Sequence, residues 1–251
     1  MEPAHSAYPT DLENEFATFL DKYKLKGQFT KNENHQHLEV FGQSFHAASP
    51  SGGTNAVLYL IHFLTSLTLD ESANNFLNFI NHYIFDDFTG HSLGINFNDS
   101  KLGNVTINAA FVTFENGKAK IGLNLRYPAS YRYETYYQKL CQIANQSNLA
   151  ATIISHKLPS HSNIDDPETK ILLETYRKHT ADQTPPLAIS GITYGRIFER
   201  GITFGPAFLG KPATLHQPNE FIELEDLFKG LEIYLDALYQ ITTVEGQNSQ
   251  D

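Results

Sequence analysis

Apolar residues recur at the three- and four-residue spacing of amphipathic helices in six parts of the chain. The last of these parts has the longest apolar stripe, formed by Leu224, Leu227, Leu231, Tyr234, Leu235 and Leu238. A stripe of this width is typical of a helix that packs one side against another element. The expected helices are Asp11–Leu25, a helix from about Thr54 through Leu67, Glu71–Phe85, Tyr131–Asn145, Pro167–Thr180 and Ile222–Ile241.

Runs that alternate between apolar and polar residues lie between these helices and predict strands. Asn116-Gly117 separates two such runs and favours a β-hairpin. The expected strands are Gln28–Lys31, His37–Ser44, Ser92–Phe97, Asn104–Phe114, Lys118–Arg126 and Ala150–His156. Glycine and proline interrupt the apolar runs of Leu187–Leu209, which favours short strands joined by tight loops. The polar link Pro159–Asp166 is the best candidate for a domain boundary.

The amino-acid composition limits the classes of protein to which the chain can belong. The chain has 251 residues, 41% of them hydrophobic, so it can bury a sizeable core. Its formal net charge of −10 argues against nucleic-acid binding, which needs clustered Lys and Arg. No apolar run is long enough to span a membrane, and the first residues do not resemble a signal peptide, so we expect a cytoplasmic protein. A single cysteine, Cys141, rules out an intrachain disulfide.

Three side chains stand out as chemical candidates. His46 follows an expected strand at the start of a loop rich in Pro and Gly, where it is either a buried histidine that bonds the loop or a functional group. Arg126 ends another strand, and its planar guanidinium could grip a carboxylate or pair with a nearby acid. His216 lies at the junction of a loop and the last helix, from which it can reach a ligand. The residue types alone leave these alternatives open.

The motifs around these residues resemble metallopeptidase family M20, and its dipeptidase V branch most closely. The first is a Gly-x-x-x-His-x-x-x-Pro-x-x-Gly-x-Asn-Ala pattern, present from Gly42 to Ala56. The others are Leu125-Arg-Tyr-Pro128, Gly191-Ile-Thr-Tyr-Gly-Arg196, Phe204-Gly-Pro206 and Leu215-His-Gln-Pro-Asn-Glu220. The resemblance runs from about Gly27 to Ile241, over the second half of the family's length. Departures at Ser190, Ile192 and Pro218 leave the path of the last loop open.

This resemblance implies a fold and a set of roles. Residues 1–158 would form an α+β lid domain of a ferredoxin-like kind, N-terminally incomplete, and residues 159–251 the C-terminal part of an α/β catalytic domain. The activity implied is zinc-dependent hydrolysis of a dipeptide by a metal-bound hydroxide. His46 would polarise the scissile carbonyl, Arg126 would bind the substrate carboxylate, and His216 would hold one of two zinc ions. Arg196 and Thr193 would bind substrate or, in an equally open alternative, brace the loop.

Most of the family's metal-binding motifs are missing from this sequence. It contains no His-x-Asp, Glu-Glu or His-Glu-x-x-His, although a zinc pair needs several carboxylates and imidazoles. We therefore expect a fragment that is inactive alone and that needs a separate N-terminal catalytic polypeptide, with poor solubility of the isolated chain. The alternative is a binding or dimerisation module that derives from such a peptidase without its chemistry.

Overall fold

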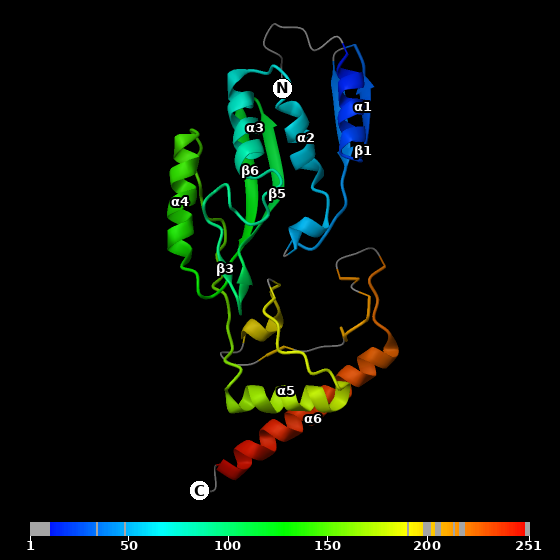
Figure 1. Cartoon of the computed structure of the whole chain (residues 1–251), viewed down its shortest axis with the longest axis vertical. Coiled ribbons are helices and arrows are strands. Elements are labelled where there is room, and N and C mark those ends of the chain that lie inside the picture. The colour runs from blue at the N-terminus through cyan, green and yellow to red at the C-terminus, as the bar shows by residue number, and fades with distance from the viewer. Residues whose placement is uncertain are drawn as a thin grey trace. The chain divides into compact units, whose positions relative to one another are not determined.

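The computed structural model describes residues 11–33, 35–47, 49–189, 191–197, 202–203, 207–212, 214–215 and 219–248, with the backbone alone for 196 and 244–248. The chain divides into two compact units, residues 1–157 (unit 1) and 158–251 (unit 2) (Figure 1). None of the helices within the described ranges is both long and apolar enough to cross a membrane.

Unit 1 mixes helices with short antiparallel sheets. Its helices are α1 (Leu12–Lys22), α2 (Ala56–Leu64), α3 (Glu71–Tyr83), α4 (Tyr133–Gln146) and the short 3-10 helix η1 (Pro50–Gly52). Its strands pair two by two as β1 (Lys26–Lys31) with β2 (Gln36–Phe41), β3 (Asn98–Asp99) with β4 (Gly103–Asn104), and β5 (Thr106–Glu115) with β6 (Lys118–Arg126). This is the expected α+β character. The described strands form no larger sheet, so the ferredoxin-like arrangement stays a prediction.

The β5–β6 hairpin is the longest ribbon of unit 1. Asn116 and Gly117 make its turn with φ angles of 50° and 70°, the left-handed conformation that an Asn-Gly turn needs. Thr106 lies opposite Arg126 in the register, and a bulge between Ala109 and Phe111 interrupts the pairing. Because the bulge shifts the alternation by one residue, Ile107 and Ala109 before it and Val112 and Phe114 after it all face the core.

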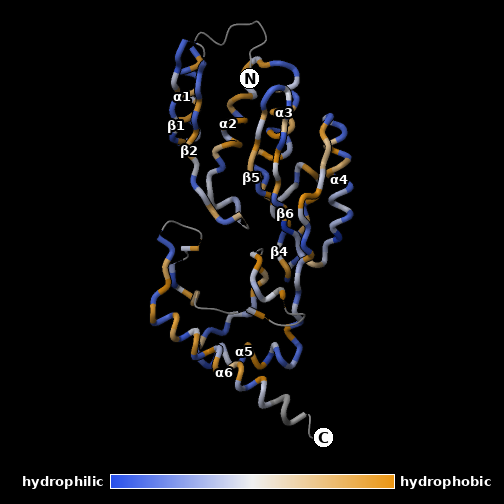
Figure 2. Tube along the Cα trace, turned by 180° about the vertical axis from the view of Figure 1, so that it is seen from behind, coloured by the Kyte–Doolittle hydropathy of each residue, from blue (hydrophilic) through white to orange (hydrophobic). Residues whose placement is uncertain are grey.

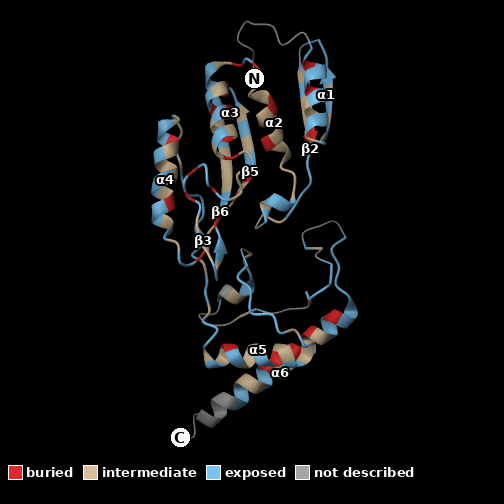
Figure 3. Ribbon diagram, in the orientation of Figure 1, coloured by how far each residue is buried: buried red, intermediate tan, exposed pale blue. Residues whose placement is uncertain are grey.

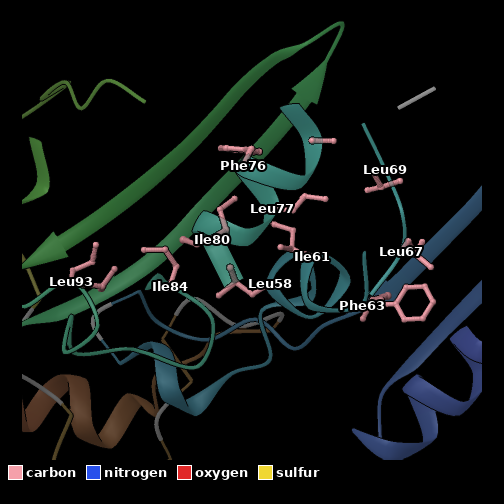
Figure 4. Close-up of a cluster of buried hydrophobic side chains, with 14 of the residues drawn as sticks. Leu58, Ile61, Phe63, Leu67, Leu69, Phe76, Leu77, Ile80, Ile84 and Leu93 are labelled. Atoms are coloured by element: carbon pink, nitrogen blue, oxygen red, sulfur yellow. The ribbon is translucent and has the colours of Figure 1, made fainter. Parts of the chain in front are cut away.

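The core of unit 1 lies between α2, α3 and the β5–β6 ribbon (Figure 4). Leu77 and Ile80 of α3 are 2% and 0% exposed. The rings of Phe16 in α1 and Phe63 in α2 lie 5.0 Å apart and join α1 to this core. Other buried members are Leu58, Ile61, Phe76, Ile84, Leu93, Ile95, Val105, Ile107 and Ala109.

Two of the expected strands of unit 1 do not form. Residues 91–94 make a turn, and 95–97 and 150–156 have no strand pairing. The Asp87 carboxylate explains the first case, because it accepts hydrogen bonds from the backbone N–H groups of Thr89, Gly90 and Ser92 and so stabilises a turn. Leu93 and Ile95 are nevertheless buried, so the alternation predicted which side chains are inside but not the backbone pairing.

Unit 2 consists of α5 (Pro167–Thr180) packed on α6 (Leu224–Asn248), with the short 3-10 helix η2 (Tyr194–Ile197) between them in sequence (Figure 3). Asp236 of α6 joins the helices, since its Oδ2 lies 2.8 Å from His179 Nε2 and 3.0 Å from Lys178 Nζ of α5. The strands expected within Leu187–Leu209 are absent from the described part of that range. A strand needs a neighbour for its backbone hydrogen bonds, and no strand is described in unit 2.

Candidate functional site

The His46 loop connects β2 to α2 and is closed at its base by two backbone hydrogen bonds. Gln43 N–H donates to the Thr54 carbonyl at 3.1 Å, and Thr54 N–H donates to the Gln43 carbonyl at 2.9 Å. Inside this closure the His46 carbonyl accepts from Ser49 N–H at 2.8 Å, just before η1 begins at Pro50. His46 is half-buried in the loop. The chain thus presents one histidine on a short loop that is tied at both ends.

The backbone leaves no room for a side chain at Gly53, whereas a side chain at Gly52 would meet only the ring of Phe45. A Cβ at Gly53 would lie 2.7 Å from the Gln43 carbonyl oxygen and 2.8 Å from Phe45 Cβ, and a Cβ at Gly52 would overlap the Phe45 ring. The glycines therefore let the returning chain pass against Gln43 and Phe45. Phe45, directly before His46, remains 51% exposed.

Asn55 ties the end of the loop to the β5–β6 ribbon. It occupies the N-cap position of α2, yet its side chain does not cap the helix. Instead, its Nδ2 donates a 2.8 Å hydrogen bond to the carbonyl of Ala109, at the β5 bulge. The bulge interrupts the regular pairing at this point, and the Asn55 amide bonds the backbone there. The sequence motif contained Asn55, but the residue pattern gave no sign of this partner.

Arg126 is the last residue of the same ribbon. Its Nε donates to Asn124 Oδ1 at 3.2 Å, and Asn124 lies two residues earlier, on the same face of β6. The side chain is half-buried. Because Asn55 fastens the His46 loop to β5 and β6 carries Arg126, both candidate groups of unit 1 depend on one ribbon for their position.

An aromatic cluster follows Arg126. The Tyr127 hydroxyl lies 2.6 Å from His156 Nε2, and the His156 ring lies 4.1 Å from that of Tyr133. Burial raises the pKa of Tyr127, with smaller contributions from Glu134 and Tyr133, so its phenol stays neutral at physiological pH. This cluster fixes the segment through His156 near the end of unit 1, a role that the sequence did not indicate.

Unit 2 carries the other candidate residues. Thr193 is exposed, and its Oγ1 accepts a hydrogen bond from Gly195 N–H at 3.2 Å. The backbone of Arg196 belongs to η2, while its side chain and the whole of His216 lie outside what is described. The candidates therefore fall into two sets, His46 and Arg126 in unit 1 and Thr193, Arg196 and His216 in unit 2.

The described side chains do not fit a zinc site by themselves. Within the described ranges, no three His, Cys, Asp or Glu side chains come close enough together to hold a metal ion. A structural or catalytic zinc needs at least three protein ligands. A metal role for His216 thus stays a prediction.

Comparison with known proteins identifies the family. Residues 14–240 match the model of Peptidase family M20/M25/M40, and the chain belongs to this family. Members of this family generally depend on a metal. The resemblance to family M20 that the motifs suggested is confirmed.

Similar curated proteins come from staphylococci. A Staphylococcus saprophyticus protein named "Putative dipeptidase" is 33% identical over 237 residues, which cover 94% of this chain and 50% of that protein. A Staphylococcus aureus (strain MW2) protein with the same kind of name is 35% identical over the same shares of the two chains. The chain thus spans about half the length of the relatives it matches.

Proposed function

We propose that this chain contributes one half of a zinc-dependent dipeptidase of the dipeptidase V type. The observation that carries the proposal is the match over 94% of the chain to relatives whose names describe dipeptidases. In this proposal residues 1–158 serve as the lid and residues 159–251 as the C-terminal part of the catalytic domain. Hydrolysis requires the other half of the peptidase, so the chain alone is inactive.

His46 is the proposed group for the scissile carbonyl. A half-buried imidazole on a tied loop can donate a hydrogen bond to the oxygen that gains negative charge as the peptide bond is attacked. Such stabilisation works best when the donor is held in advance, and the Gln43–Thr54 bridge and the Asn55–Ala109 bond hold this loop. The metal, when bound, supplies a Lewis acid for the hydrolysis.

Arg126 is the proposed group for the substrate's terminal carboxylate. Its guanidinium can donate two parallel hydrogen bonds to a carboxylate, which favours very short peptides over the interior of longer ones. The Asn124 side-chain oxygen accepts a hydrogen bond from Arg126 Nε and so orients the guanidinium group. Thr193 and Arg196 are proposed to contact substrate, and His216 to hold one zinc ion.

The test compares kcat/KM for hydrolysis of β-Ala-His with kcat/KM for its C-terminal amide. Both are measured with added zinc or manganese. The chain is combined for this purpose with the half of the Staphylococcus aureus relative that it does not match. Arg126→Gln should lower kcat/KM about 10- to 200-fold for the free dipeptide, which is the range for losing a hydrogen bond to a charged group. It should have much less effect on the C-terminal amide of the same dipeptide.

Arg132→Gln is the matched control. Arg132 is an exposed arginine of unit 1 whose Nε lies 4.0 Å from Glu134 Oε2. This variant should hydrolyse both substrates like the unaltered chain. Equal losses on the acid and the amide in Arg126→Gln would contradict the carboxylate role, and absence of hydrolysis from a well-formed complex would contradict the dipeptidase proposal itself.

A further inference from the structure

Helix α6 has two opposite faces. One face buries Asp226, Ile233 and Ala237, which follow one another at helical spacing, and Asp236 beside it bonds α5. The opposite face is apolar and exposed. Figure 2 shows the hydrophobic residues that recur along α6. We call it the α6 apolar face, and it consists of Leu224, Leu227, Phe228, Leu231, Leu235, Leu238 and Tyr239.

The exposed apolar area of this face is larger than is usual for a helix surface that faces only solvent. Leu231 is 54% exposed, and Leu224, Leu235 and Leu238 are 70%, 59% and 61% exposed. Side chains of this size together present on the order of 900 Å², close to the roughly 800 Å² that one partner contributes to a standard interface. Contiguous apolar patches of several hundred Å² mark interaction surfaces.

More apolar surface lies in the segments before α6. Exposed large side chains occur there before η2, within it and after Phe208. They are Leu187, Ile189, Ile192, Tyr194, Ile197, Leu209, Leu215, Phe221 and Ile222. Unit 2 therefore presents apolar side chains along most of its described length, and a single small ligand would not cover them.

Charge argues against a second copy of this chain as the occupant. Glu225 and Glu232 are exposed and lie along one border of the α6 apolar face. An antiparallel pair of α6 helices would bring these acidic borders together, and like charges at helix borders are destabilising. The net charge of −10 also opposes self-association. The favoured occupant is a different surface, apolar at its centre and basic along one edge.

We propose that the α6 apolar face docks the half of the peptidase that this chain does not span. The inference rests on the proposed function and on the finding that the chain covers 50% of the relatives' length. An unmatched half of similar length is large enough to cover α6 and the segments before it. In this arrangement the apolar face becomes part of a core shared by the two halves.

The experiment measures binding, not turnover. The full chain is titrated by calorimetry with a polypeptide that comprises the unmatched half of the Staphylococcus aureus relative. We expect a one-to-one complex with a negative heat-capacity change, the mark of apolar burial. The double variant Leu231→Glu with Leu235→Glu should weaken it at least about 30-fold, since such central anchors dominate interface energies. Glutamate is a good helix former, so circular dichroism should show α6 intact.

Ile154→Glu is the matched control, because Ile154 is an apolar residue that is 89% exposed in unit 1. It should bind like the unaltered chain. The proposal is overturned if no complex forms, if the double variant binds equally well, or if the chain alone forms dimers that the double variant abolishes. A complex that forms but does not hydrolyse dipeptides would leave the docking surface standing and contradict the proposed function, so the two failures are distinguishable.

Discussion

The two units use their apolar residues in opposite ways. In unit 1, the apolar side of α3 packs against α2 and the β5–β6 ribbon, and Leu77 is 2% exposed. In unit 2, the apolar stripe of α6 points away from α5, and Leu231 is 54% exposed. Both helices have the amphipathic pattern that predicts burial. Such a pattern therefore shows that a face needs a partner, and this partner need not lie within the described part of the same unit.

The largest expected effect comes from making the same substitution on both helices. Leu77→Ala should destabilise unit 1 by about 3 kcal/mol, because it removes a fully packed side chain and leaves a cavity. Leu231→Ala should change the stability of the isolated chain by less than about 0.5 kcal/mol, as for other exposed sites. Urea unfolding followed by circular dichroism measures both. Similar losses at the two sites would mean that the α6 apolar face is covered within the chain.

The next largest effect is expected at Asn55, which helps to hold the parts of unit 1 together. Asn55→Ala removes the donor to the Ala109 carbonyl and should cost about 1–2 kcal/mol. It should also speed amide hydrogen exchange in the His46 loop, where Ser49 N–H and Thr54 N–H report directly. Asn14→Ala removes an exposed bond to Asp11 and serves as the control, with little effect expected. Unchanged exchange in Asn55→Ala would contradict the anchoring role.

A smaller effect is expected at the ribbon's turn. Gly117 has a φ of 70°, and no atom lies within 4 Å of the position that a Cβ would take, so Gly117→Ala meets no clash. The strain of the left-handed conformation alone should cost about 1 kcal/mol, seen as a lower urea midpoint. Asn116→Gly keeps that conformation accessible and should leave the midpoint nearly unchanged. An unaffected Gly117→Ala variant would show that the hairpin is held by its strands alone.

The smallest effect concerns the contact between α5 and α6. Hydrogen bonds from His179, Lys178 and Gln240 lower the pKa of Asp236 from 3.8 to about 2. A lowered folded-state pKa means that the ionised group stabilises unit 2 fully above pH 3.8, and that this contribution is lost as the pH falls through about 2. Asp236→Asn should weaken helix packing at pH 7 and flatten the acid dependence of α-helical signal between these values.

The control for that pH dependence is Asp165→Asn. Asp165 pairs with Lys170 at 3.6 Å on the surface of unit 2, where ion pairs contribute little. Its acid profile should match that of the unaltered chain. If Asp236→Asn has the same profile as well, then α5 and α6 are held by apolar packing and not by this carboxylate.

The sequence was sufficient to predict the elements whose interaction partners lie nearby in the chain. The Asn116-Gly117 turn predicted the β5–β6 hairpin, and Pro167 with helical spacing predicted α5 with its observed bounds. It was insufficient where a side-chain hydrogen bond determined the backbone conformation. The Asp87 carboxylate accepts a hydrogen bond from Ser92 N–H, and residues 91–94 form a turn and not a strand. The sequence also could not show which side of α6 would meet α5, because Ile233 and Ala237 form a second, weaker apolar stripe.

The candidate site was predictable only in part. The motifs gave His46 and Arg126, whereas the Asn55–Ala109 and Tyr127–His156 bonds join residues 54 and 29 positions apart and need the fold. His216 and the Arg196 side chain lie outside the described residues, so their roles remain predictions.

The most direct measurement is the rate of β-Ala-His hydrolysis by the full chain as the other half of the Staphylococcus aureus relative is added in the presence of zinc. We expect no turnover from either polypeptide alone and saturable turnover from the mixture. His46→Ala should abolish turnover without weakening the complex, and the Leu231→Glu and Leu235→Glu double variant should prevent the complex. Full turnover by the chain alone, or a tight complex with no turnover, would contradict the proposal that this chain is one half of a dipeptidase.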